Sequence, residues 1–220
     1  MCAVGSLKTN DTMLCPLCEN HDVHFFAEDK NKRYKHCNVC DLVFVEEDFL
    51  PDQTEEKLRY DEHQNTIEDK GYVAFLSRII QPLQSHLNEN AIGLDFGSGP
   101  NPVLAKILKD KGYEMEIYDP YFAPDLKVFD RKYDFITATE VVEHMHNPAE
   151  DYKRMFSVLE KEGVLALMTK LRTPDINFTT WHYKNDLTHV SFYSPKTVQW
   201  IGNQFHRKAE IILPDLIFFI

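Results

Sequence analysis

The sequence lacks any run of about 18 apolar residues, the length that a helix needs to span a bilayer. Its first eight residues also lack the basic stretch and apolar segment of a secretory signal. Positive charge is in short supply, since 24 basic residues stand against 35 acidic ones and the formal net charge is -11. A mean field of this sign repels phosphate backbones and anionic lipid headgroups. We therefore expect a cytoplasmic protein without membrane attachment, and we do not expect a nucleic-acid partner.

Cysteine is also scarce, with five in the chain, yet four of them form two CxxC pairs. The pairs are Cys15 with Cys18 and Cys37 with Cys40, at a spacing typical of a four-thiolate zinc site. Four thiolates close the coordination shell of the ion, so such a site would be structural rather than catalytic. A redox dithiol and unmetallated thiols are the alternatives. We expect no role for Cys2.

The segment around the second cysteine pair, residues 34–45, resembles the second half of a zinc ribbon. The glycine that often follows each knuckle of such a ribbon is replaced here by Glu19 and Asp41. Of these two, Asp tolerates the left-handed conformation better than Glu. We therefore expect residues 1–50 to form a small zinc-ribbon-like segment.

The remaining sequence predicts a single α/β domain. Residues 51–90 read as a helical lid or linker, and from residue 91 onward short apolar strands alternate with helices. Such alternation implies a mostly parallel, Rossmann-like sheet with helices on both faces over residues 91–220. We expect residues 171–193 to be a long loop, Ser194 to cap a helix, and the chain to end in an antiparallel hairpin. The expected strands are 91–96, 114–119, 133–138, 163–169, 209–213 and 216–220, and the main helices are 102–111, 148–159 and 194–205.

A glycine-containing turn follows the first of these strands. Asp95 closes the strand, and Gly97, Ser98 and Gly99 make a turn where a cofactor can approach the backbone closely. About 20 residues later Asp119 ends the next strand, where an acid can bind a pair of ribose hydroxyls. A dinucleotide site would carry a third glycine, which packs a helix beneath a pyrophosphate. Because that glycine is absent, S-adenosylmethionine, which has no pyrophosphate, is the favoured cofactor.

Three segments together resemble the class I S-adenosylmethionine-dependent methyltransferases. Residues 93–99 look like motif I of that family, residues 134–144 like its fourth-strand motif, and residues 159–165 like the approach to its fifth strand. The resemblance, over roughly residues 55–220, implies that Gly97 and Gly99 pass the amino-acid portion of the cofactor. It also implies that Asp119 binds the ribose, and that Thr139 and Glu140 lie beside the adenosine or the reaction centre. The sequence departs from the family at Asn101, which replaces a glycine, and in a short link between residues 119 and 134 that leaves room only for a stunted third strand.

Residues 59–65 resemble the lid helix of some members of this family. The resemblance places Tyr60, His63 and Asn65 near the methionine end of the cofactor. An ordinary polar surface helix is the alternative interpretation.

Two carboxylates and an imidazole follow the fourth strand, at Glu140, Glu143 and His144. With His189 they resemble the Mg²⁺ site of methyltransferases that act on RNA 3′ ends or on catechol-like quinols. The same residues occur without metal in other members, where His144 or His189 would act as a general base. We predict Glu143, His144 and His189 as catalytic residues and leave the Mg²⁺ ion open.

The sequence thus predicts an enzyme that transfers a methyl group directly to an oxygen of a small molecule. No Asn-Pro-Pro-aromatic or Asp-Pro-Pro-aromatic motif follows the fourth strand, which argues against methylation of an exocyclic base nitrogen. The loop at residues 181–186 would either stack on a planar acceptor or pack against its own protein. A ribbon-guided RNA methyltransferase and a non-catalytic adaptor that binds the cofactor are the alternative functions, and the oligomeric state stays open.

Overall fold

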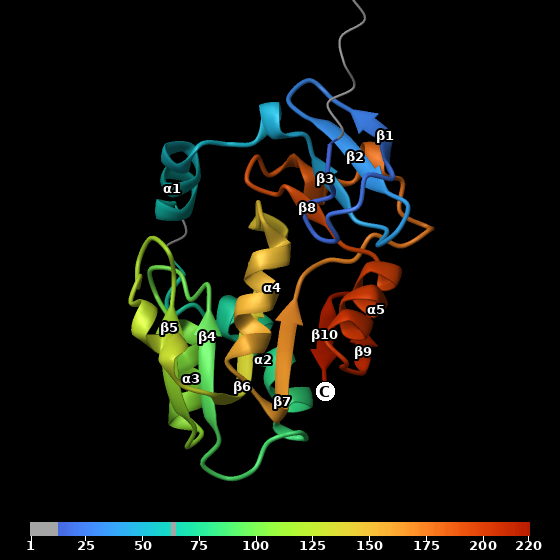
Figure 1. Cartoon of the computed structure of the whole chain (residues 1–220). Helices are drawn as coiled ribbons and strands as arrows, with labels where there is room; N and C mark the ends of the chain where they lie inside the picture. Colours follow the sequence, from blue (N-terminus) through green and yellow to red (C-terminus); the bar gives the residue numbers. More distant parts are fainter. Residues whose placement is uncertain (1–12, 63–64) are drawn as a thin grey trace, which may run out of the picture.

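A computed structural model describes residues 13–62 and 65–220, which contain two sheets (Figure 1). The larger sheet has the strand order β5-β4-β6-β7-β10-β9. Strands β4 to β7 pair in parallel, whereas β10 is antiparallel to both β7 and β9. The mostly parallel α/β fold and its C-terminal hairpin are therefore confirmed. The strands are β4 (Ile92–Phe96), β5 (Glu114–Tyr118), β6 (Tyr133–Thr139), β7 (Leu159–Met168), β9 (Ala209–Ile212) and β10 (Leu216–Phe219).

Helices cover both faces of this sheet because the strands alternate apolar side chains between them. Phe135 of β6 packs into the core beneath α2 (Lys70–Gln84) and α3 (Val103–Asp110). Its neighbour Ile136 packs on the opposite side, with α4 (Pro148–Ser157) and α5 (Pro195–Gln204). Ser194 caps α5 by accepting from the Thr197 backbone N–H, as predicted.

The link between β5 and β6 contains no third strand within residues 119–132, all of which are described. It forms the 3₁₀ helix η2 (Leu126–Asp130) and an isolated bridge between Asp119 and Ala123. The stunted strand expected here is thus reduced to a single bridge.

The smaller sheet joins the N-terminal segment to a distant part of the chain. Its order is β1-β2-β3-β8, all antiparallel, and it comprises β1 (Val23–Glu28), β2 (Arg33–Cys37), β3 (Val43–Val45) and β8 (Ser191–Phe192). Strand β8 lies in the segment that we expected to be a long loop. That segment also forms the 3₁₀ helices η4 (Phe178–Thr180) and η5 (His182–Asn185), so the loop prediction is wrong. Strand β8 forms because it pairs with β3, and no feature of the neighbouring sequence indicates this long-range contact.

The N-terminal segment also shares a hydrophobic core with the large sheet. Leu42 and Phe44 belong to the same buried cluster as Tyr152 of α4 and Tyr193, the residue after β8. The Pro16 carbonyl accepts from the Ala149 backbone N–H at the start of α4. Residues 13–50 are therefore packed as one layer of the molecule.

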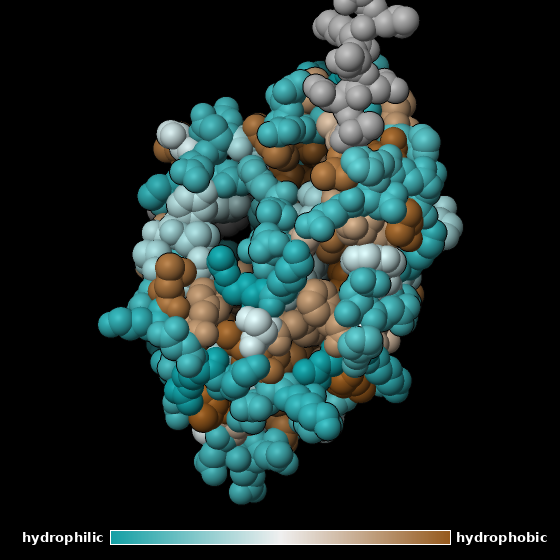
Figure 2. All heavy atoms as spheres, viewed as in Figure 1, coloured by the Kyte–Doolittle hydropathy of each residue, from teal (hydrophilic) through white to brown (hydrophobic). Residues whose placement is uncertain are grey.

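Three further elements complete the described residues, the 3₁₀ helices η1 (Glu47–Phe49) and η3 (Val142–His144) and helix α1 (Gln53–Asp61). Asp52 and Glu55 form a capping box at the start of α1, which explains why the helix begins there. None of the helices in the described ranges is long and apolar enough to cross a membrane. The face seen in Figure 2 is largely hydrophilic, in keeping with the high content of charged residues.

Candidate active site

A cavity of about 1080 Å³ lies at the carboxyl ends of β4, β5 and β6, between the sheet and α1. This edge of an open parallel sheet is where ligands of α/β proteins bind. All of the described residues that we predicted for the cofactor line it, and His144 and His189 do so as well. The cofactor candidates on its wall are Tyr60, Asn65, Asp95, Gly97, Ser98, Gly99, Asp119, Thr139 and Glu140.

The turn after β4 has a backbone that suits glycine. Gly97 and Gly99 have φ angles of 75° and 66°, in the left-handed region. A Cβ atom on Gly97 would lie 2.5 Å from Val141, whereas one on Gly99 would meet nothing within 4 Å. The Gly97 and Ser98 N–H groups both donate to the Tyr118 carbonyl, which fixes the turn against β5. The open space beside Gly99 leaves room for a ligand to approach the backbone.

Asp119 is held firmly at the end of β5. Its Oδ2 accepts from the Gly99 N–H at 2.9 Å, and its Oδ1 accepts from the N–H groups of Tyr121 and Phe122. The carboxylate is therefore oriented by backbone groups, and its Oδ2, which accepts one hydrogen bond, keeps acceptor capacity for a ligand. The contact also links the two halves of the predicted cofactor site.

Asp95 occupies the floor of the cavity. Thr137 Oγ1 donates to its carboxylate at 2.7 Å, and burial raises the pKa of Asp95 to about 6 although that hydrogen bond opposes the rise. The side chain thus ties β4 to β6, and the prediction that it contacts the cofactor stays a prediction.

Glu140 adopts a left-handed backbone with φ of 54° directly after β6. Its N–H donates to the Met168 carbonyl, which holds it against β7. Burial, followed by the neighbouring Glu143 carboxylate, raises the pKa of Glu140 to about 9. These surroundings favour the protonated form of the carboxyl, which can donate a hydrogen bond into the cavity.

Helix α1 forms the roof of the cavity. The buried Glu56 carboxylate accepts from the Tyr121 hydroxyl at 2.6 Å and lies 2.7 Å from His146 Nε2. Arg59 forms an ion pair with Asp186 at 2.8 Å. The sequence reasoning missed Glu56, Tyr121 and His146, because their partners are distant in the chain. The only local signal that could have indicated the roof is the spacing of Glu56 and Arg59, which are three residues apart and so lie on one side of a helix.

The predicted lid residues are divided between described and undescribed positions. The Tyr60 ring contacts Tyr121 at 5.5 Å and His144 at 5.4 Å between centroids. Asn65 lies on the cavity wall, as does Tyr72. His63 lies outside the described residues.

Glu143, His144 and His189 come together beside the cavity. Each provides one ligand atom, and these atoms lie within 4.8 Å of one another. Glu140 is not part of this group, so the four-residue set expected from the sequence reduces to three.

The hydrogen bonds around this group define its donor atoms. Glu143 is fully buried; Tyr183 donates to its Oε1, while its Oε2 has no hydrogen-bond partner among the described residues. His144 Nδ1 lies 3.0 Å from the Thr188 carbonyl and His189 Nδ1 lies 2.7 Å from the Tyr183 carbonyl. A nitrogen this close to a carbonyl carries the proton in a neutral imidazole, so Nε2 of each ring holds the lone pair.

The environment of His189 decides between two chemical roles. Burial lowers the pKa of His189 to about 4, although the Asp186 carboxylate opposes the decrease. The ring is therefore neutral near pH 7, which suits a metal ligand, and it is a weak base for removing a proton from a hydroxyl.

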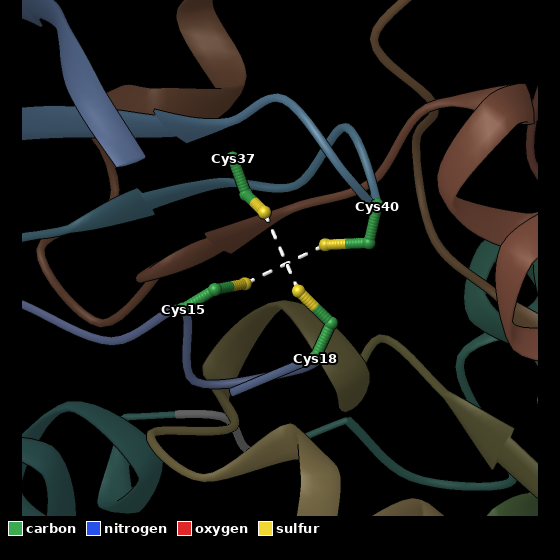
Figure 3. A group of neighbouring side chains, drawn as sticks. All are labelled: Cys15, Cys18, Cys37 and Cys40. Carbon is green, nitrogen blue, oxygen red and sulfur yellow. Dashed lines mark hydrogen bonds between the residues drawn. The ribbon is translucent and has the colours of Figure 1, made fainter. Parts of the chain in front are cut away.

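The four paired cysteines converge on one point (Figure 3). The Sγ atoms of Cys15 and Cys40 are 3.5 Å apart, and those of Cys18 and Cys37 are 3.4 Å apart. Tetrahedral zinc with Zn–S bonds of about 2.3 Å requires sulfurs about 3.8 Å apart, so the arrangement fits the ion. Glu19 and Asp41, which follow the knuckles, have φ angles of 56° and 64°, the left-handed geometry for which glycine is common.

Trp181 does not line the cavity. Its side chain is buried and packs against Phe178, Tyr183 and Phe192. Of the two roles considered for this loop, Trp181 therefore takes the packing role. The neighbouring His182 does line the cavity, as does Lys170.

Comparison with known proteins identifies the family. Residues 63–205 match the family described as a methyltransferase domain, which is more than half of the chain. The chain belongs to this methyltransferase family. The prediction of an S-adenosylmethionine-dependent methyltransferase is confirmed. A separate comparison with curated proteins found no significant match.

Solved structures of methyltransferases share the fold at low sequence identity. The 1,6-didemethyltoxoflavin-N1-methyltransferase of Burkholderia thailandensis, solved with bound 1,6-didemethyltoxoflavin and S-adenosylhomocysteine, has a TM-score of 0.54 and 12% identity over 89% of this chain and 96% of its own. CalO1, a methyltransferase in calicheamicin biosynthesis solved with S-adenosylhomocysteine, has a TM-score of 0.51 and 10% identity over 77% of this chain and 58% of its own. This similarity shows that the fold is that of a methyltransferase.

Proposed function

We propose that this methyltransferase binds S-adenosylmethionine in the 1080 Å³ cavity and methylates an oxygen of a small molecule. The observation that carries the proposal is the hydrogen bond from the Gly99 N–H to Asp119, which joins the glycine turn to the acid at the cavity wall. Gly97 and Gly99 would lie along the amino-acid portion of the cofactor, and Asp119 would accept from its ribose hydroxyls. When bound, the cofactor supplies a sulfonium methyl group that an acceptor oxygen can displace.

The roof over part of the cavity supports a small acceptor. Helix α1 covers the cavity and is held on both sides, through Glu56 to Tyr121 and through Arg59 to Asp186. A cavity covered in this way admits a small molecule more readily than a polymer. The Burkholderia thailandensis enzyme, which shares the fold, was solved with 1,6-didemethyltoxoflavin bound. The enzyme's main contribution would be to hold acceptor and cofactor in line.

We further propose that Glu143, His144 and His189 hold a divalent ion beside the cavity, where the methyl acceptor would bind. We call this part of the site the acceptor side. The buried and unpartnered Glu143 Oε2 supports this, because a buried carboxylate oxygen without a partner is costly unless a ligand satisfies it. Two imidazoles and one carboxylate suit Mn²⁺, Fe²⁺ or Co²⁺ better than the Mg²⁺ ion considered from the sequence. A bound ion would lower the pKa of an acceptor hydroxyl. A metal-free enzyme, in which His144 acts as the base, is the alternative.

The cysteine group is proposed as a structural zinc site. All four sulfurs would be ligands, which leaves no open position for a substrate. The ion would fix the two knuckles whose turns pack on α4 and α5.

Isothermal titration calorimetry with S-adenosylhomocysteine tests the cofactor site directly. We expect micromolar binding by the zinc-loaded wild-type chain, and an absence of binding would refute the enzyme function and favour an adaptor. A panel of hydroxylated aromatic molecules with S-adenosylmethionine then tests the acceptor, with S-adenosylhomocysteine release as the readout. Release with RNA alone, together with salt-sensitive RNA binding, would support the ribbon-guided alternative instead.

Titration with Mn²⁺ tests the second metal site. The zinc-loaded wild type should bind one Mn²⁺, and Glu143→Gln should lose this binding while it keeps zinc and S-adenosylhomocysteine. Equal Mn²⁺ binding by wild type and E143Q would place the ion elsewhere.

A further inference from the structure

The hairpin between β1 and β2 carries a buried lysine that reaches across to the opposite part of the chain. Lys32 is only 3% exposed. Its Nζ donates to three backbone carbonyls, those of Lys184 at 3.4 Å, Asp186 at 2.6 Å and His189 at 2.8 Å. An ammonium group has three N–H donors, and here each finds an acceptor on the same short segment. Lys32 of the N-terminal segment thus binds the backbone of residues 184–189 at three points.

The turn that presents Lys32 is itself preorganised. Asp29 Oδ1 accepts from the backbone N–H groups of Asn31 and Lys32, and its Oδ2 accepts from Lys184 Nζ at 2.6 Å. Asp29 therefore shapes the turn and also binds the segment that Lys32 holds. The hairpin and the segment are joined by side chains of both.

Residues 184–189 supply several contacts on the acceptor side of the active site. This segment contains His189, and its Thr188 carbonyl accepts from His144. The Glu143 carbonyl accepts from the N–H of Val190, the next residue. Its Asp186 carboxylate binds Arg59 of the roof helix. A shift of this backbone would move His189, which is one proposed ligand, and Thr188, the partner of the proposed ligand His144. It would also move Asp186, to which the roof helix is bound.

We propose that Lys32 is a positioning residue for the acceptor side of the active site, which fixes residues 184–189 so that His189 meets Glu143 and His144. The proposal rests on the proposed divalent site for its functional consequence. Lys32 does not line the cavity and acts through the backbone of His189. It gives the N-terminal segment a role in the reaction beyond packing.

The charge of Lys32 suits this role. Burial lowers its pKa to about 8, against the opposing effect of the Asp186 and Asp29 carboxylates, so the ammonium is still charged at neutral pH. Hydrogen bonds from a charged donor are stronger than those from a neutral one. A methionine has nearly the same length but no donor, and would leave the three carbonyls without this partner.

The test compares Lys32→Met with Lys35→Met in the zinc-loaded full chain. Lys35 is a partly buried lysine of β2 whose ammonium pairs with Glu46, away from residues 184–189. Three quantities are measured: hydrogen exchange of residues 182–190, Mn²⁺ affinity and S-adenosylhomocysteine affinity. For K32M we expect clearly faster exchange in this segment and Mn²⁺ affinity lower by about 10–100-fold, the usual effect of losing a group that orients a metal ligand. S-adenosylhomocysteine affinity should stay within about twofold, and K35M should match the wild type in all three measurements.

The outcomes separate this proposal from the metal site on which it rests. If the wild type binds no Mn²⁺, the divalent site fails, and hydrogen exchange alone decides whether Lys32 orders the segment. Unchanged exchange and Mn²⁺ affinity in K32M would overturn the proposal. So would an equal loss of Mn²⁺ and S-adenosylhomocysteine binding, which would indicate a general loss of structure. If K32M does not fold, Lys32→Gln is used, because its shorter amide cannot reach all three carbonyls and the same selective loss is expected.

Discussion

At the scale of single residues, Asp119 combines an ordinary acidic side chain with an unusually fixed position. Three backbone N–H groups orient its carboxylate, from Gly99 on one side and from Tyr121 and Phe122 on the other. A carboxylate held in this way loses little conformational freedom when it accepts from a ribose.

We expect Asp119→Ala to weaken S-adenosylhomocysteine binding about 10–100-fold. Hydrogen bonds to a charged group contribute about 1.5–3 kcal/mol, and each 1.4 kcal/mol is a factor of about ten in affinity. Calorimetric titration of the folded variant measures the effect. Asp125→Ala is the control, because the Asp125 carboxylate caps η2 by accepting from the Lys127 N–H and does not line the cavity. Wild-type affinity in D119A would show that the ribose is bound elsewhere.

Asp95 makes stability depend on pH. Burial raises its pKa from 3.8 to about 6, so the folded state binds a proton more tightly than the unfolded state. The stability that comes from this proton is fully present below about pH 4 and is lost as the pH rises to about 6. A shift of about two pKa units corresponds to about 3 kcal/mol.

Asp95→Asn therefore should not show this pH dependence. The free energy of unfolding in urea, measured for the wild type and D95N between pH 4 and pH 7, gives the comparison. We expect the wild type to lose about 2.4 kcal/mol relative to D95N over this range, slightly less than the full shift because the unfolded Asp95 is already partly ionised at pH 4. A difference that stays constant with pH would mean that Asp95 has an ordinary pKa in the folded protein.

At the scale of elements, α1 is a roof attached at points that its own sequence does not reveal. Its apolar content is low, so burial of hydrophobic side chains contributes little to its position. Glu56 holds it to Tyr121 and His146, and Arg59 holds it to Asp186. Opening the roof therefore breaks a few polar contacts together with the ring contacts of Tyr60 to Tyr121 and His144.

Glu56→Ala should release this roof. Two hydrogen-bonded contacts of about 1 kcal/mol each are lost, so opening should become about 30-fold more frequent. Faster hydrogen exchange in residues 53–61 and faster dissociation of S-adenosylhomocysteine in stopped flow would report it. Asp61→Ala serves as the matched variant, since Asp61 pairs only with Lys57 of the same helix among the contacts described. Identical exchange in E56A and D61A would show that Glu56 does not hold the roof.

Elements of the large sheet could be predicted because their signals are local. The apolar strand before Gly97, the acid at the end of β5 and the cap at Ser194 each depend on neighbouring residues. Strand β8 could not be predicted, because its two residues are ordered by Val43 and Phe44, almost 150 positions earlier. The same reason hides Lys32, whose acceptors lie more than 150 residues away. The cofactor side of the candidate site could thus be predicted, because its residues follow one another closely in the sequence. The acceptor side could be predicted less well, because its contacts join segments that are distant in the sequence.

At the scale of the whole molecule, the cysteine group lies at the junction of both sheets. Cys15, Cys37 and Cys40 are fully buried in the core that also contains Tyr193. Asp41, directly after the second knuckle, binds Arg172 at 2.7 Å and accepts from Ser194, the cap of α5. The knuckle geometry therefore sets the position of elements at both ends of residues 172–194.

This shared core predicts that loss of zinc destabilises the entire protein in one transition. Cys40→Ala should lower zinc content, and it should lower the melting temperature by about 10 °C or more, since several kcal/mol of metal-linked folding energy are lost and each shifts it by about 2–4 °C. Calorimetric melting, with zinc measured by mass spectrometry, checks both effects, and Cys2→Ser should retain the zinc and the melting temperature. If the N-terminal segment were an independent module, C40A would instead give two transitions, with the one that S-adenosylhomocysteine shifts upward unchanged from the wild type. A single lowered transition that still responds to S-adenosylhomocysteine is the result expected of a chain in which residues 13–50 complete the core of the methyltransferase.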